Sequence, residues 1–120
     1  MGRPDVVFGT DLRQVGDLVV MSLTGELDMA TAPALYETVE RAQGQGPIVV
    51  DLRDLTFIDS MGIRALIQIY AAGQNGHASI SFIRPQGEVV QRVLAIAGVE
   101  GLLAWTEPPE GEARDATRSA

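Results

Sequence analysis

The sequence predicts a single α/β domain with a mixed, mostly parallel β-sheet. Apolar segments of strand length alternate with apolar patterns of helical period, as in strand–helix–strand units. Residues 47–52 form an almost unbroken apolar run, which is typical of a central strand covered on both faces. The chain has 120 residues, 46% of them hydrophobic and 21% charged, which is enough for one core. We find no internal repeat and no sign of a second domain.

Five strands are expected along the chain. Residues 5–9 are predicted to form the first strand, and residues 17–25, which alternate in polarity, the second. A turn at Gly16 and Asp17 would join these two strands as an antiparallel hairpin. Residues 47–52, 78–84 and 99–105 are predicted to supply the other strands. The sheet therefore begins with a hairpin and continues with parallel crossovers.

Three helices are expected between these strands, over residues 31–46, 60–73 and 86–98. The first would begin at Thr31 as N-cap, with Pro33 in its first turn. Residues 107–120 have no apolar period and are rich in polar residues and proline. We therefore expect a folded domain over 1–106 and a flexible tail over 107–120. The apolar stripe of the first helix is Leu35, Tyr36, Val39 and Ala42, and that of the third is Val89, Val90, Val93, Leu94 and Ala97.

Composition excludes several classes of function. The chain has no cysteine, no lysine and one histidine, His77, so neither a thiolate metal site nor lysine chemistry is available, and no metal or cofactor is expected. Its net charge of -7 argues against general affinity for nucleic acid or anionic lipid. The apolar runs are too short to span a membrane, and no signal peptide precedes the domain. These observations predict a cytoplasmic protein.

Enzyme motifs are absent or incomplete. A P-loop requires a lysine, and a serine hydrolase requires a G-x-S-x-G motif together with a histidine base. His77 follows Gly76 in an expected surface loop, so we interpret it as an exposed loop residue. Two carboxylate pairs, Glu26 with Asp28 and Asp51 with Asp54, leave general acid–base catalysis open, although such pairs are common on solvated loops. The sequence does not predict an enzyme.

Residues 54–62, DLTFIDSMG, place a carboxylate and a hydroxyl where the second helix begins. Asp59 or Ser60 is expected to cap this helix by accepting a hydrogen bond from its free N–H groups. A helix N-terminus also favours negative charge, so a phosphate on Ser60 would be tolerated there. Gly62 costs helix stability in the first turn, and we expect it to keep the N-terminal amides accessible. Ser60 is therefore a candidate phosphorylation site.

The second helix carries two apolar stripes. Ile63, Leu66, Ile67 and Tyr70 are expected to face the sheet. Met61, Ala65 and Ile69 form a second stripe, which is either covered by a neighbouring helix or exposed beside Ser60 as a surface for a partner protein.

The chain resembles the STAS domain family, and specifically anti-sigma factor antagonists of the SpoIIAA type. The resemblance rests on GELDMATAPAL, residues 25–35, and VVDLRDLTFIDSMGIRAL, residues 49–66, and it extends from about residue 6 to residue 105. It implies a sheet of four or five strands with helices mainly on one side. It also implies that Ser60, the first serine position of the family's D-S-S-G or D-S-T-G motif, is phosphorylated. The residue after this serine is usually Ser or Thr in the family, whereas this chain has Met61 at that position.

The resemblance also implies partners. An anti-sigma factor that is itself a GHKL-type serine kinase would bind the unphosphorylated antagonist, and a PP2C-type phosphatase would restore it after phosphorylation. We expect no nucleic-acid or membrane partner and a monomer or weak dimer. An accessory subunit of a lipid-transport or stress-signalling complex is the alternative. The expected partner-binding residues are Gly25, Glu26, Leu27, Asp28, Asp59, Met61, Gly62 and Ile69.

Overall fold

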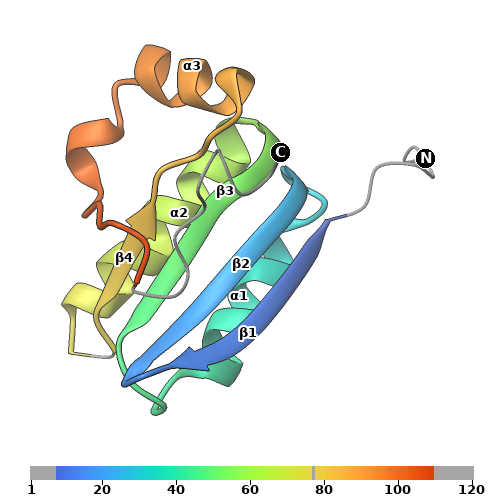
Figure 1. Ribbon diagram of the computed structural model, residues 1–120. Coiled ribbons are helices and arrows are strands. Elements are labelled where there is room, and N and C mark those ends of the chain that lie inside the picture. Colours follow the sequence, from blue (N-terminus) through green and yellow to red (C-terminus); the bar gives the residue numbers. More distant parts are fainter. Residues whose placement is uncertain (1–7, 77, 110–120) are drawn as a thin grey trace, which may run out of the picture.

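The computed structural model describes residues 8–76 and 78–109, which form a mixed four-stranded sheet with helices on one side (Figure 1). The elements follow the order β1 (Gly9–Val15), β2 (Leu18–Leu27), α1 (Ala32–Ala42), β3 (Ile48–Ile58), α2 (Ser60–Gln74), β4 (Ile80–Ile83), α3 (Glu88–Ala97) and the 3₁₀ helix η1 (Glu100–Leu102). This confirms the predicted fold class. His77 and most of the predicted tail lie outside the described residues.

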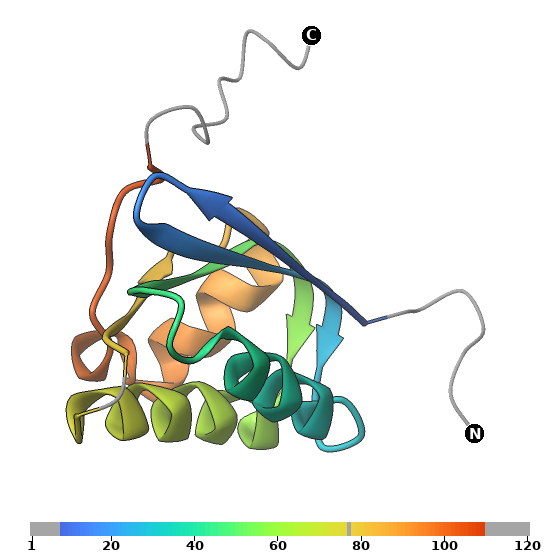
Figure 2. The ribbon, with the colours of Figure 1, turned by 90° about the horizontal axis from the view of Figure 1, so that it is seen from below.

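The strands lie in the order β1-β2-β3-β4. β1 pairs antiparallel with β2 across the expected turn at Gly16 and Asp17, whereas β3 is parallel to both β2 and β4. In Figure 2 the helices lie below the strands, because each crossover returns on the same side of the sheet. Because β2 and β3 are parallel, their carboxyl ends meet at one edge of the sheet, the upper edge in Figure 1.

The main core lies between the sheet and the helices. Alternate residues of β2, such as Met21 and Leu23, are buried there together with Leu52 and Leu66. A smaller apolar cluster on the opposite face of the sheet consists of Val20, Val49 and Ile83. Because both faces of β3 are buried over residues 48–52, this part of the strand is a nearly continuous apolar run, as the sequence indicated for residues 47–52.

The first and last strands depart from expectation. β1 begins at Gly9, so the strand predicted over 5–9 is misplaced, and residues 5–7 lie outside the described residues. β1 is an edge strand of mixed polarity, and its pairing with β2 is not visible in its own sequence. The strand predicted over 99–105 is replaced by η1 and a single parallel bridge between Phe82 and Trp105. Because η1 takes up residues 100–102, only a short segment remains to pair with β4.

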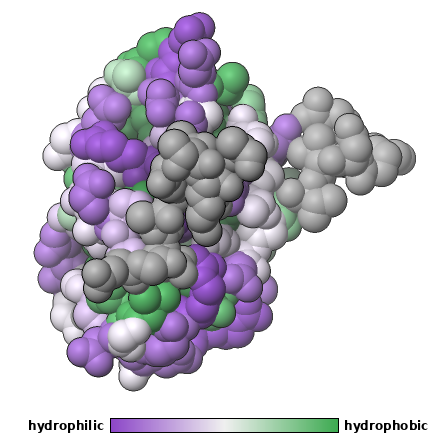
Figure 3. All heavy atoms as spheres, in the orientation of Figure 1, coloured by the Kyte–Doolittle hydropathy of each residue, from purple (hydrophilic) through white to green (hydrophobic). Residues whose placement is uncertain are grey.

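α1 and α3 are shorter than predicted, α2 is one residue longer, and some of the helical stripes differ. Thr31 occupies the N-cap position of α1, but its side chain makes no capping hydrogen bond. In α3 only Val90 and Leu94 of the predicted stripe are buried, whereas Val89 is 55% exposed. Apolar atoms are accordingly visible at the upper edge of the molecule in Figure 3, over α3. α3 packs against β3, and four of its seven apolar residues lie exposed at the surface: Val89, Ala95, Ile96 and Ala97.

Candidate functional site

Ser60 is the first residue of α2 and follows directly on the end of β3. Asp59 is the N-cap, and its Oδ1 accepts a hydrogen bond of 2.9 Å from the Gly62 N–H. Of the two cap candidates, the structure therefore selects Asp59. The side chain of Ser60 is exposed and forms no hydrogen bond with any residue that the structure describes. The Ser60 hydroxyl is not needed as a helix cap, because the carboxylate of Asp59 already accepts a hydrogen bond from the first turn of α2.

The start of α2 is joined to the end of β2 by backbone contacts. In the parallel register Leu27 lies opposite Ile58, and the Asp59 N–H donates a hydrogen bond of 3.2 Å to the Leu27 carbonyl oxygen. Gly62 packs against the same carbonyl: a Cβ on residue 62 would lie 2.4 Å from it and 2.8 Å from Ile58 Cγ1. The segment 25–28 and the serine are therefore held side by side.

Gly62 has a different role from the one expected. It is buried, so it does not leave the helix amides open to an approaching molecule. Its lack of a side chain instead lets the first turn of α2 lie against β2. Gly62 therefore positions Ser60 and has no surface to offer a partner.

Two other predicted contact residues are also buried. Leu27 is fully buried, and Ile69 is 3% exposed. α1 packs beside α2, and Tyr36 of α1 donates a hydrogen bond to Gln68 of α2. Of the two readings of the second stripe, burial is therefore correct for Ala65 and Ile69, and only Met61, at 39% exposed, reaches the surface.

The loop between β2 and α1 is held in one shape by side-chain hydrogen bonds. Asp28 Oδ1 accepts hydrogen bonds from the N–H groups of Ala30 (3.0 Å) and Thr31 (3.1 Å). Thr31 Oγ1 donates to the Glu26 carbonyl oxygen at 2.8 Å, and the Asp28 N–H donates back to Thr31 Oγ1 at 2.9 Å. The side chains of Asp28 and Thr31 therefore fix the conformation of the loop through these hydrogen bonds, and the Thr31 side chain does not cap α1. The loop that would meet a partner is preorganised.

Gly25 and Thr56 form a bulge that redirects the end of β3. In the β2–β3 register Gly25 lies opposite Leu55 and Glu26 opposite Phe57, so Thr56 is an extra residue in β3. Thr56 Oγ1 donates a hydrogen bond of 3.0 Å to the Gly25 carbonyl oxygen, and Gly25 has a positive φ of 87°. Simple alternation would bury Phe57 together with Leu55, but the bulge leaves Phe57 38% exposed.

The surface around Ser60 therefore carries an apolar group that the sequence did not reveal. Met29, in the β2–α1 loop, is 69% exposed. Together with Phe57 near the end of β3 and Met61 in the first turn of α2, it supplies three large exposed apolar side chains where these segments adjoin. Glu26 near the end of β2, Asp28 in the β2–α1 loop and Asp59 at the N-cap of α2 add carboxylates to the same region. We call Met29, Phe57, Ser60 and Met61 the serine surface. Met29 has no periodic signal in the sequence, and Phe57 is exposed only because of the bulge.

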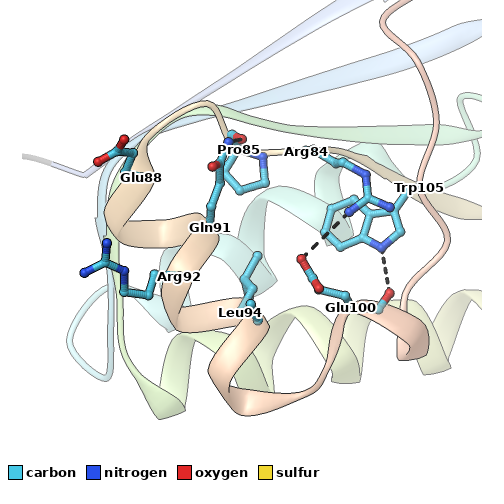
Figure 4. A pocket seen from close by; sticks show the side chains of 9 residues that line it. Arg84, Pro85, Glu88, Gln91, Arg92, Leu94, Glu100 and Trp105 are labelled. Atoms are coloured by element: carbon cyan, nitrogen blue, oxygen red, sulfur yellow. Dashed lines mark hydrogen bonds and ion pairs between the residues drawn. The ribbon is translucent and has the colours of Figure 1, made fainter.

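The cavities lie elsewhere. A cavity of about 480 Å³ opens between α3 and the segment 100–105 (Figure 4). There the Arg84 guanidinium stacks on Trp105 at 4.5 Å from the ring centroid, and Trp105 Nε1 donates a hydrogen bond of 2.7 Å to the Glu100 carbonyl oxygen. Neither this cavity nor the one beside Arg53 and Trp105 is lined by a residue of the serine surface. An exposed serine without an enclosing cavity suits protein docking better than small-molecule catalysis.

The described part of the chain contains neither a metal-binding cluster nor a membrane-spanning helix. Among residues 8–76 and 78–109, no cluster of three or more His, Cys, Asp or Glu could hold a metal ion. In the same part of the chain no helix is long and apolar enough to cross a bilayer. Asp51 does not lie in an open acid–base site, because it is 2% exposed and pairs bidentately with buried Arg53 at 3.0 and 2.8 Å.

Comparison with known proteins defines the family. The family model described as "Mlab, STAS domain" matches residues 10–104, and the chain belongs to this STAS-domain family. Over 103 residues it is 29% identical to the anti-sigma-F factor antagonist RsfB of Mycobacterium tuberculosis, covering 83% of this chain and 81% of that protein.

Solved structures share the fold. An anti-sigma factor antagonist from Mycobacterium paratuberculosis superposes with a TM-score of 0.70 at 23% identity, covering 93% of this chain and 95% of that one. The unphosphorylated form of the antagonist SpoIIAA superposes with a TM-score of 0.66 at 21% identity, covering 93% and 98% of the two chains. These matches confirm the predicted resemblance and fold class.

Proposed function

We propose that this protein is an anti-sigma factor antagonist that works by partner switching. The unphosphorylated form binds an anti-sigma factor through the serine surface and so frees a sigma factor. Phosphorylation of Ser60 by that same partner ends the complex. The observation that carries the proposal is the exposed Ser60 hydroxyl, free of intramolecular hydrogen bonds with described residues, at a helix start held against the 25–28 segment.

The named relatives support this proposal, since RsfB and the superposed bacterial structures are described as anti-sigma factor antagonists. The geometry leads us to revise the set of contact residues. Met29 and Phe57 join Gly25, Glu26, Asp28, Asp59 and Met61 at the interface, whereas Leu27, Gly62 and Ile69 support it from beneath.

Phosphorylation is expected to alter docking much more than folding. A phosphate adds about -1.5 to -2 charges at pH 7. The segments beside Ser60 already carry the negative charges of Glu26, Asp28 and Asp59. The helix N-terminus offsets part of the repulsion, by about 0.3–1 kcal/mol. A partner that packs on Met61 and Phe57 would have to desolvate the new charge, which is much more costly. The net result is release of the partner from an intact fold.

The remaining roles follow from this mechanism. The partner is a GHKL-type serine kinase, a PP2C-type phosphatase regenerates the antagonist, and the antagonist itself catalyses no reaction. Because it acts on a regulator of transcription, it would operate in the cytoplasm.

The test uses GHKL-type anti-sigma kinases from the same organism. Calorimetry should detect binding of the unmodified protein to one of them, and incubation with ATP should add about 80 Da to Ser60. Ser60→Ala should bind and not be released by ATP. Ser60→Asp should bind at least about tenfold more weakly, equivalent to 1.4 kcal/mol. Stoichiometric phosphorylation elsewhere with Ser60 unmodified, or unchanged affinity after phosphorylation, would refute the switch.

The same experiment separates the alternative, an accessory subunit of a lipid-transport or stress-signalling complex. Such a subunit needs no phosphoacceptor, so its assembly with a partner should be indifferent to the Ser60→Ala and Ser60→Asp substitutions.

A further inference from the structure

The three methionines that the structure describes fall into two environments. Met21 is fully buried in the core beneath the helices, whereas Met29 is 69% and Met61 39% exposed. Met29 follows the end of β2 and Met61 lies in the first turn of α2, and the Asp59–Leu27 hydrogen bond joins these two segments. Met61 follows Ser60 directly, and Met29 follows Asp28. Two of the three described methionines therefore lie on the serine surface.

Exposed methionine has a reactivity that other apolar residues lack. Methionine is a soft, adaptable contact residue at protein-binding surfaces. Its thioether is also readily converted to a sulfoxide, which is polar and chiral and disrupts methionine-rich interfaces. The chain contains no cysteine, so no thiol in it competes for the same oxidants. Within the described part of the chain, the exposed thioethers are those of the two methionines beside Ser60.

We propose that Met29 and Met61 are oxidation sites, and that their conversion to sulfoxides by a hydroperoxide releases the partner independently of phosphorylation. This inference rests on the proposed function, since it acts on the same docking surface. Leu, Val or Phe at these positions would provide apolar contact without this sensitivity. The two methionines therefore make the surface responsive to oxidants.

The chemical step balances with the hydroperoxide as the only oxidant. The thioether sulfur attacks one peroxide oxygen, the O–O bond breaks and an S–O bond forms. The sulfur loses two electrons, and the departing oxygen takes up a proton and leaves as water or an alcohol. A methionine sulfoxide reductase with a dithiol reverses the step, giving the thioether, water and a disulfide.

The fold should survive this change. Met29 lies in a loop whose shape depends on hydrogen bonds of Asp28 and Thr31, not on its own side chain. Met61 lies at the surface of the first turn of α2, where Asp59 supplies the cap. Met21 is shielded in the core and should react only after unfolding. Among the methionines that the structure describes, oxidation in the native state is therefore confined to the two on the serine surface.

The experiment treats the folded protein with dilute hydrogen peroxide. Peptide mass spectrometry should find one added oxygen, about 16 Da, on Met29 and on Met61 before any on Met21. Calorimetry against the kinase that binds the untreated protein should show an affinity loss of about tenfold or more, with Ser60 unphosphorylated and the circular dichroism spectrum unchanged. Treatment with both epimer-specific sulfoxide reductases should restore binding.

A matched variant separates oxidation from other damage. Met29→Leu with Met61→Leu keeps the apolar volume. The affinity of this double variant for the partner should be the same before and after peroxide treatment. Unchanged affinity of wild type after complete oxidation of both residues would overturn the inference and leave the proposed function standing. A peroxide effect that persists in the double variant would also overturn it. Failure of the untreated protein to bind any anti-sigma kinase would overturn the proposed function and this inference together.

Discussion

Replacing Gly62 by alanine tests the contact that positions Ser60. The new Cβ would lie 2.4 Å from the Leu27 carbonyl oxygen, 3.0 Å from the Leu27 carbonyl carbon and 2.8 Å from Ile58 Cγ1. The two nearest Leu27 atoms are backbone atoms in the parallel pairing of β2 with β3, so they cannot move aside as a flexible side chain would. The first turn of α2 must therefore retreat by roughly 1 Å, which stretches the Asp59–Leu27 hydrogen bond.

Two opposing effects determine the magnitude. Alanine is favoured over glycine within a helix by about 1 kcal/mol. Overpacking a buried contact costs about 1–3 kcal/mol, and a rigid backbone neighbour places this case at the upper end. The net expectation for Gly62→Ala is a loss of about 2 kcal/mol in the free energy of unfolding, or about 10 °C in Tm.

Urea denaturation followed by circular dichroism measures this change. Gly101→Ala serves as the control, because a Cβ there would meet no atom within 4 Å, so its effect should stay within about 0.5 kcal/mol. Where Gly62→Ala is still fully folded, it should also bind the partner more weakly, because Ser60 and Met61 move with the helix turn. A Gly62→Ala protein as stable as wild type, or more stable, would refute the packing role and restore helix propensity as the dominant effect.

Three further substitutions test other parts of the site and its support. Asp59→Ala should lower the free energy of unfolding by about 1 kcal/mol through loss of the N-cap, whereas Asp59→Asn should retain most of it; equal losses in urea denaturation would argue against capping. Asp51→Ala should cost about 3–5 kcal/mol in the same assay, because it leaves the buried Arg53 guanidinium without its bidentate partner; a loss below 1 kcal/mol would show that Arg53 escapes to solvent. Arg64, exposed and one helical turn after Ser60, should pair with a phosphate there and lower its second pKa; Arg64→Ala should therefore raise that pKa in a ³¹P NMR titration of the phosphoprotein, and an unchanged titration would exclude the pairing.

The features that the sequence alone could predict are those that depend on residues close together in the chain. The nearly continuous apolar run at 47–52 identified a central strand, and the stripe of Ile63 and Leu66 identified the buried face of α2. The hydroxyl of Ser60 at a helix start, beside a carboxylate able to cap the helix, was visible from neighbouring residues alone. These features depend on interactions between residues close in the chain, so the order of residue types is enough to reveal them.

Only the tertiary structure decided which residues are exposed at the site. Phe57 is exposed because an extra residue, Thr56, interrupts the alternation of β3 against β2, and Ile69 is buried because α1 lies beside α2. Glycine is needed at position 62 because a side chain there would clash with the carbonyl oxygen of Leu27, 35 residues earlier in the chain. Each outcome depends on which element packs against which, and a one-dimensional pattern records the period of an element but not its neighbours.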